Sequence, residues 1–352
     1  MMERVNIRKK LLIAFIIIIF INYTIVLSRD NSQYLRNANI NIERRVNPIG
    51  RTIGLKLYTD GVLVIGMSEI TDENDAQQEP YVNSGIKEGD MIKSINGTEV
   101  HNTQELMNYI NESNGNEISI KYQRDNKEIY TTIKPVKSAD NSYMLGLWVR
   151  DAAAGIGTLT YYEEATNTFA ALGHGINDVD TLKLLNISNG ELVTSQIVSI
   201  VKGEKGKPGE IRGIIDNGIN IGTVEINSNI GVYGKVTNIN YINKVKKDEV
   251  PVASRNQIKE GKAKIICQLT NENLTEEYEI EIKKIYKTNY KDNKSMLIKV
   301  TDSKLIEKTG GIIPGMSGTP IIQNGKFVGA ITNVLLNDPT QGYAICADMM
   351  MK

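Results

Sequence analysis

Apolar and polar residues divide this chain into four regions, each with its own pattern. Residues 11–27 are almost continuously apolar, and residues 28–51 are polar without periodicity. From residue 52 to residue 136, short alternating runs surround one stretch with helical spacing, and from residue 142 to residue 352 short runs alternate with glycine and asparagine turns. The patterns predict an apolar helix, a linker, a small α+β domain and a larger, mainly β domain.

The apolar stretch at residues 11–27 predicts a helix long enough to span a membrane. Seventeen helical residues extend about 26 Å, close to a hydrocarbon thickness of about 30 Å. Basic residues at positions 8–10 predict that the amino terminus stays in the cytoplasm while the remainder crosses the membrane. Residues 26–29 fit a signal-peptidase site poorly. We therefore expect residues 1–27 to form an uncleaved anchor, with a cleaved signal and a buried core helix as alternatives.

The α+β region contains several local signals of a compact domain. Asn96-Gly97 between two apolar runs predicts a β-hairpin. Asn102 followed by Glu105 predicts a capping box at the start of an amphipathic helix. Together with the stretch GIKEGDMIKSING, these features resemble a PDZ domain of the bacterial protease type.

The PDZ resemblance implies a peptide-binding site near the start of this region. Ile53, Gly54 and Leu55 would form a loop whose backbone N–H groups bind a peptide carboxylate. The peptide would then pair as an additional strand beside residues 55–58. A small β-rich domain whose glycines only make turns is the alternative.

The region from residue 142 to residue 352 combines many short predicted strands with few helical patterns. This combination is typical of β-sandwiches and β-barrels, and about 210 residues suffice for two small barrels. We therefore expect a mainly β fold here, without internal repeats.

Within the β region, Ser317 lies between glycines in Gly-Met-Ser-Gly-Thr-Pro and precedes a strand, an Asn-Gly turn and another strand. A nucleophilic serine needs an accessible hydroxyl and backbone N–H groups directed at the developing oxyanion. Glycines leave room for both because they lack a Cβ. The motif resembles the nucleophile loop of chymotrypsin-like proteases, with Met316 in place of their usual aspartate.

His174 lies between two glycines at the end of an apolar run, and the only other histidine is His101. An ordinary pKa of about 6.5 makes histidine a suitable general base near neutral pH. Catalysis by a serine and a histidine also uses a third group that orients the imidazole. Asp178, Asp180 and Asp302 are candidates for that group, and spacing in the sequence does not choose among them.

Charge and cysteine usage disfavour several other functions. The 41 Lys and Arg residues balance the 41 Asp and Glu residues, so no nucleic-acid partner is expected. Cys267 and Cys346 lie far apart, and the chain contains neither a CxxC nor an HExxH motif. We therefore expect no metal site, no disulfide framework and no cofactor.

The order of these regions along the chain resembles that of the SpoIVB family of sporulation serine peptidases. Members of that family have a membrane segment, then a PDZ domain and then a chymotrypsin-like double β-barrel. The likeness rests on residues 147–151, 155–160, 171–176, 309–320 and 337–343. The resemblance implies that Ser317 is the nucleophile, His174 the base and Asp302 the orienting acid. It also implies that the amides of Gly315 and Ser317 form the oxyanion hole.

The resemblance further implies a role in development. Such an enzyme is exported into the space between the two forespore membranes, cleaves itself, and cuts a membrane-complex regulator of an intramembrane protease. That protease then activates a mother-cell sigma factor, and a secreted inhibitor of the BofC type is an implied partner. A PDZ processing protease with a Ser–Lys dyad and a catalytically silent PDZ scaffold are the alternatives.

Two positions depart from the family pattern. Thr319 stands where the family usually has serine, and Asn333 stands where it often has histidine. Neither position belongs to the implied chemistry. The departures leave room for a diverged paralogue with another substrate.

Overall fold

A computed structural model describes residues 43–215, 218–270, 274–286 and 293–351 of the chain. The predicted membrane helix and all but the end of the predicted linker lie outside these residues. Within them, no helix is both long and apolar enough to cross a bilayer.

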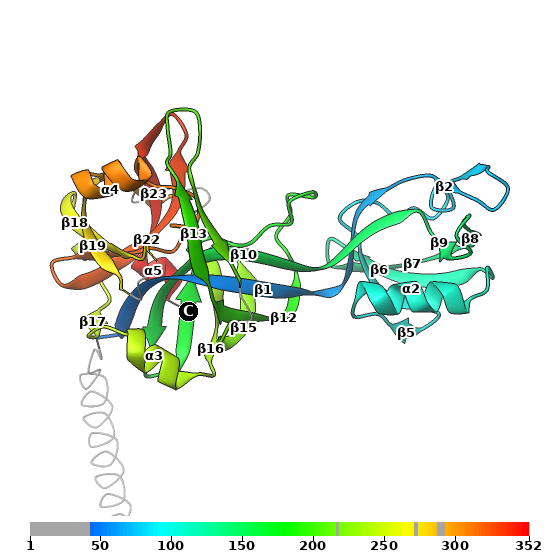
Figure 1. Cartoon of the computed structure of the whole chain (residues 1–352). Coiled ribbons are helices and arrows are strands. Elements are labelled where there is room, and N and C mark those ends of the chain that lie inside the picture. Colours follow the sequence, from blue (N-terminus) through cyan, green and yellow to red (C-terminus); the bar gives the residue numbers. More distant parts are fainter. Residues whose placement is uncertain (1–42, 216–217, 271–273, 287–292, 352) are drawn as a thin grey trace, which may run out of the picture. The chain divides into compact units, whose positions relative to one another are not determined.

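The amino-terminal part of the described chain is a small α+β unit (Figure 1). The end of the long strand β1 (Arg45–Met67) pairs with β4 (Met91–Ile95). Strand β4 pairs in turn with β6 (Ile118–Arg124), and β6 pairs with β7 (Lys127–Ile133). Helix α2 (Thr103–Glu112) buries Leu106 and Ile110 in the core of this unit. Short strands complete it: β2 (Ile70–Thr71), β3 (Gln77–Gln78), β5 (Thr98–Glu99), β8 (Val136–Lys137) and β9 (Tyr143–Met144).

The predicted hairpin is confirmed, and of the predicted capping box the half made by Asn102 is confirmed. Asn96 and Gly97 have φ angles of 49° and 82° and connect β4 to β5, as a tight hairpin turn requires. The Asn102 side chain caps α2 by accepting from the backbone N–H of Glu105 at 2.9 Å. The Glu105 carboxylate in turn accepts from the His101 N–H at 2.8 Å.

Six strands then form a first closed ring. Strand β10 (Leu147–Glu163) pairs with β11 (Thr168–Ala171), and the order continues through β16 (Gly231–Val236), β15 (Asn220–Ser228) and β12 (Ile187–Thr194) to β1. Because β1 also pairs with β10, the ring closes. The hairpin of β13 (Gln196–Val201) and β14 (Glu210–Ile214) and the helix α3 (Ile239–Val245) accompany it.

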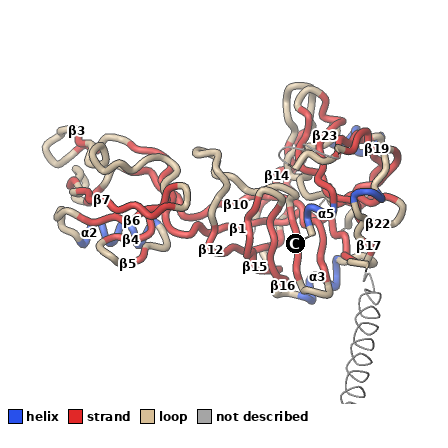
Figure 2. The backbone as a smooth tube through the Cα atoms, turned by 180° about the vertical axis from the view of Figure 1, so that it is seen from behind, coloured by secondary structure: helices blue, strands red, loops and turns tan. Residues whose placement is uncertain are grey.

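A second barrel follows along the chain. Its closed order is β18 (Gly261–Cys267), β19 (Glu276–Ile285), β20 (Met296–Val300), β23 (Asp338–Cys346), β22 (Lys326–Leu335) and β21 (Pro320–Gln323). Strand β17 (Val250–Pro251), a 3-10 turn (Arg255–Gln257) and the helices α4 (Ser303–Thr309) and α5 (Ala347–Met350) complete it. Strands dominate the described chain, as Figure 2 shows, and the expectation of a mainly β fold with two barrels is confirmed.

The structure contradicts the expected carboxylate-binding loop at Ile53, Gly54 and Leu55. These residues lie inside β1 and are hydrogen-bonded to β10 on one side and to β12 on the other. A peptide therefore finds no free strand edge beside residues 55–58. Gly54 is not a turn residue either, because it pairs with Ile156 and Val193 inside β1. A Cβ there would lie 2.7 Å from Cγ1 of Ile215. It is a close-packing glycine of the first barrel.

Candidate active site

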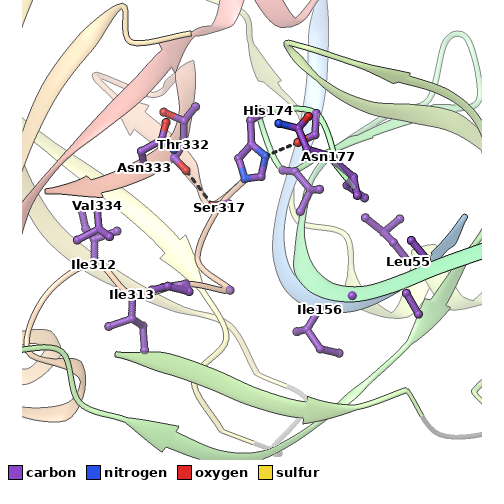
Figure 3. A pocket seen from close by; sticks show the side chains of 18 residues that line it. Leu55, Ile156, His174, Asn177, Ile312, Ile313, Ser317, Thr332, Asn333 and Val334 are labelled. Carbon is purple, nitrogen blue, oxygen red and sulfur yellow. Dashed lines mark hydrogen bonds between the residues drawn. The ribbon is translucent and has the colours of Figure 1, made fainter. Parts of the chain in front are cut away.

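A cavity of about 520 Å³ lies where loops and strands of the two barrels meet. Leu55 and β10 contribute from the first barrel, together with the turn that carries His174. The loop that carries Ser317 and residues 332–334 of β22 contribute from the second barrel. Figure 3 shows the 18 side chains that line it, and none of them is an aspartate, glutamate, lysine or arginine. A Ser–Lys dyad therefore has no candidate base among these lining residues.

The loop that carries Ser317 is held by its neighbours on both sides. Gly315 and Gly318 have φ angles of 100° and 92°, which favour glycine. Between them, Met316 is fully buried in the core of the second barrel, whereas Ser317 faces the cavity. The methionine thus serves as an apolar anchor for the loop, at a position where a charged aspartate would be costly to bury.

Two backbone amides of this loop have no acceptor in the described chain. The N–H groups of Met316 and Thr319 donate to carbonyls of the loop itself, both at 3.0 Å, and that of Gly318 donates to Ile331 at 2.8 Å. The N–H groups of Gly315 and Ser317 make no hydrogen bond within the described residues. An oxyanion hole requires two such unengaged donors beside the nucleophile.

Thr158 of β10 ties the Ser317 loop to the first barrel. Its hydroxyl donates to the carbonyl of Gly315 at 2.8 Å, and its backbone N–H donates to the carbonyl of Ser317 at 3.2 Å. Thr158 is 3% exposed, so both bonds are shielded from water. The sequence alone does not single out Thr158, because only the pairing of distant segments gives it this role.

A strained turn presents His174 to the same cavity. Leu172 and Gly173 both have positive φ angles, 71° and 74°, immediately after β11. Leucine pays about 1–3 kcal/mol for this conformation, so the surroundings must hold it. The N–H of Leu172 donates to Thr158 at 3.2 Å and that of Gly173 to Ala171 at 2.9 Å. Such strain is typical of functional sites.

The environment of His174 favours a neutral imidazole with one defined tautomer. Burial lowers its pKa below the usual value, and a hydrogen bond to Gly175 offsets this only in part. Nδ1 lies 2.8 Å from the carbonyl oxygen of Gly175. A carbonyl only accepts, so Nδ1 carries the proton and Nε2 keeps a free lone pair.

The Ser317 hydroxyl does not yet contact this lone pair. It donates instead to the carbonyl of Thr332 at 2.8 Å, and within the described residues no hydrogen bond joins it to His174 (Figure 3). Both side chains nonetheless line one cavity. Catalytic hydrogen bonds are often formed only once substrate binds. The sequence predicts that Ser317 and His174 share a site, and both residues line this cavity.

None of the three candidate aspartates lies at this cavity. Asp302 is the N-cap of α4 and accepts from the backbone N–H groups of Lys304 at 3.0 Å and Leu305 at 3.1 Å. Asp178 and Asp180 both pair with the guanidinium of Arg150. The role of Asp302 as orienting acid therefore remains an inference from the family resemblance.

A second cavity, of about 580 Å³, lies in the α+β unit. Leu106, Met107 and Ile110 line it from α2, and the segment from residue 142 to residue 149 lines it opposite the helix. Trp148 in this segment is 61% exposed, which is unusual for so large an apolar side chain. An apolar groove beside a helix thus exists in this unit, away from the position expected from the sequence.

Comparisons with known families match residues 141–351 to the SpoIVB peptidase S55 family and residues 50–134 to the PDZ domain family. The zinc metalloprotease RasP of Shouchella clausii is 31% identical over 137 residues, which are 38% of this chain and 30% of that protein. The regulator of sigma-W protease RasP of Bacillus subtilis is 25% identical over 130 residues, 37% of this chain and 28% of that protein. The chain thus spans less than a third of either curated relative.

Solved structures with partial similarity include both kinds of domain. The PDZ domain of an SdrC-like protein from Listeria monocytogenes is 24% identical, covers 26% of this chain and 87% of that chain, and has a TM-score of 0.20. A protease from M. tuberculosis in its active form is 11% identical, covers 56% of this chain and 70% of that chain, and has a TM-score of 0.30. The family match over residues 141–351 covers more than half of the sequence, and the chain therefore belongs to the SpoIVB peptidase S55 family of serine peptidases and carries a PDZ domain.

Proposed function

We propose that this protein is an exported, membrane-associated serine endopeptidase of sporulation. It cleaves itself and then cuts a regulatory membrane protein, so that a pro-sigma factor is processed. The observation that carries the proposal is one cavity lined by Ser317 and His174 from two different barrels, next to two unengaged backbone amides. Membership of the sporulation peptidase family supports the biological role.

The proposed reaction begins with a rotation of the Ser317 hydroxyl from the carbonyl of Thr332 to Nε2 of His174. His174 takes the proton as Oγ attacks the carbonyl carbon of the scissile peptide, and the amides of Gly315 and Ser317 bind the resulting oxyanion. The imidazolium then protonates the leaving amine, which departs and leaves an acyl-enzyme. Water, deprotonated by His174, hydrolyses the ester and releases the carboxylate product.

The lining of the cavity favours an uncharged, aliphatic side chain next to the cleaved bond. Ile312, Ile313 and Val334 line it beside Ser317, and no charged group is present to bind a charged side chain. Strand β22 pairs with β21 only as far as Ala330. Residues 332–334 of β22 thus offer an edge at which an extended substrate can add as a strand.

We also propose that the PDZ domain binds an extended peptide segment of the substrate at the cavity beside α2. Its apolar lining suits apolar side chains, and PDZ domains as a class bind peptides in this way. The family role supplies the expected partners, namely the chain itself, the regulator of an intramembrane protease and a BofC-type inhibitor. We propose, with this role, that the peptidase acts outside the cytoplasm, anchored or secreted, in the forespore intermembrane space.

Self-processing of the purified full chain tests the proposal. Ser317→Ala should abolish it while the thermal unfolding midpoint stays unchanged, and His174→Ala should abolish it as well. Ser199→Ala, which alters an exposed serine of β13, is the matched control and should process normally. Processing that persists in purified Ser317→Ala protein would reject this nucleophile, and loss of processing with Ser317→Ala alone would reject His174 as the base.

A further inference from the structure

We propose that Asn227 is the positioning residue for His174 and that it acts through a single peptide group. The inference rests on the proposed function, because it explains how the imidazole is oriented for general-base catalysis. It starts from the finding that no carboxylate lines the cavity. The group that holds His174 must therefore be sought among its other contacts.

Asn227 lies near the end of β15 and docks onto the loop that follows His174. Its Oδ1 accepts from the N–H of Ile176 at 2.9 Å. Its Nδ2 donates to the carbonyls of Ile176 at 2.8 Å and of Leu185 at 2.9 Å. The backbone N–H of Leu185 also donates to Ile176 at 3.0 Å, so these contacts close the base of the loop.

The decisive contact concerns the peptide group between Gly175 and Ile176. In a trans peptide the N–H and the C=O point in opposite directions. Because Asn227 binds the Ile176 N–H, the Gly175 carbonyl of the same plane is held away from Asn227. That carbonyl is the group that lies 2.8 Å from Nδ1 of His174. Two hydrogen bonds in series thus link the Asn227 carboxamide to the imidazole, and such chains strengthen one another.

The chemistry of the three partners requires an amide at position 227. The backbone offers one donor, the N–H of Ile176, and two acceptors, the carbonyls of Ile176 and Leu185. A carboxamide has one oxygen to accept and two N–H groups to donate, so it satisfies all three. An aspartate would accept from Ile176 but would place a carboxylate oxygen against two carbonyls. An alanine would leave all three backbone groups of the loop without this partner. Asn227 therefore performs, through one peptide, the orienting task that a triad gives to an acid.

Imidazole nitrogen NMR of the full chain tests this directly, because the chain has only two histidines. The protein is labelled with ¹⁵N at histidine and carries Ser317→Ala, which prevents self-cleavage, and His101→Gln assigns the signals. We expect His174 to be the Nδ1–H tautomer at a pH above its titration. Asn227→Ala should lower the ratio of Nδ1–H to Nε2–H about tenfold, the effect of one hydrogen bond of ordinary strength.

Three further variants sharpen the test. Asn227→Asp still accepts from the Ile176 N–H but places a carboxylate oxygen against the carbonyls of Ile176 and Leu185, so it should shift the tautomer ratio in the same direction as Asn227→Ala but by less. Thr223→Ala, an exposed position on the same strand, should leave the ratio unchanged. Asn227→Ser is a milder replacement that should give a smaller shift in the same direction if Asn227→Ala fails to fold.

A wild-type His174 in the Nε2–H form, or an unchanged ratio in folded Asn227 variants, would overturn the inference. The measurement uses no substrate and removes the nucleophile. The tautomer ratio is therefore read separately from self-processing, so a failure of this inference and a failure of the proposed function are distinguishable.

Discussion

The Ser317 hydroxyl can donate to the carbonyl of Thr332 or, in the proposed reaction, to Nε2 of His174, and its reactivity depends on which of the two accepts the hydrogen bond. In the structure its hydroxyl donates to the carbonyl of Thr332, which only accepts and cannot remove the proton. The proposed reaction requires this hydroxyl to turn toward His174, which lines the same cavity. Such rotations between staggered positions are small in energy compared with a chemical step. In the proposed reaction this arrangement is a resting state, in which His174 lines the same cavity and the N–H groups of Gly315 and Ser317 are unengaged within the described residues.

Asp302 allows a sharp test at the level of one residue. As an N-cap it is replaceable by asparagine, which caps equally well, but not by alanine. We predict that Asp302→Asn keeps stability and self-processing, whereas Asp302→Ala lowers the free energy of unfolding by about 1 kcal/mol. Denaturant unfolding and processing rates measure both. A loss of activity of about 10⁴-fold in stable Asp302→Asn protein would instead identify Asp302 as the orienting acid.

The burial of His174 predicts a dependence of stability on pH. Its pKa is lowered in the folded chain, so the unfolded chain binds a proton more readily. Protonation therefore destabilises the folded chain as the pH falls below about 6.5, by about 1.4 kcal/mol for each unit by which the pKa is lowered. In a Ser317→Ala background, His174→Gln should lose less stability than its parent between about pH 7 and about pH 5. Equal losses in thermal unfolding would contradict this.

At the scale of elements, the pairing of β1 explains why residues 53–55 do not form the carboxylate-binding loop that the sequence predicts. Residues 53–58 of β1 lie between β10 and β12, and the residues of these two strands that pair with them lie about a hundred or more positions away along the chain. Pairing over such distances leaves no local trace in the sequence. The hairpin at Asn96 and the cap at Asn102 were predictable because their causes lie within a few residues. The sequence context of Ser317 and His174 is enough to make them candidates, whereas the partners of Thr158 and Asn227 lie far away along the chain and depend on the folded structure.

Gly54 gives a test of its assignment to the barrel. Gly54→Ala places a Cβ 2.7 Å from Ile215 and 3.0 Å from Val193, so the core must shift. We predict a loss of about 1–3 kcal/mol in unfolding free energy by denaturant titration. Gly155→Ala, on the neighbouring strand, meets nothing within 4 Å and serves as control, with an expected change within about 0.5 kcal/mol. Full stability of Gly54→Ala together with weakened peptide binding would instead support the carboxylate loop.

At the scale of the whole described chain, strand β10 connects the two cavities. Trp148 and Val149 line the cavity beside α2, and the next residue, Arg150, pairs with Asp178 and Asp180 in the loop that follows His174. The Asp178 side chain is 1% exposed. A charge buried to this extent needs its partner, so the ion pair links strand β10 to the loop that follows His174.

A double-mutant cycle measures this link. Arg150→Met leaves the Asp178 carboxylate buried without its guanidinium and should cost about 3 kcal/mol of unfolding free energy. Asp178→Asn in the same protein removes the unpaired charge, so the double variant should be more stable than the sum of the two single changes predicts. Strictly additive changes in denaturant unfolding would show that the two side chains do not interact energetically.

The central claim is that Ser317 is a nucleophile activated by His174, and covalent labelling tests it most directly. The purified full chain is treated with a fluorophosphonate and analysed by mass spectrometry after digestion. We predict one adduct, on the peptide that contains Ser317, which is absent from Ser317→Ala and strongly reduced in His174→Ala. An unlabelled wild-type chain, or an adduct on another residue that persists in Ser317→Ala, would contradict the account.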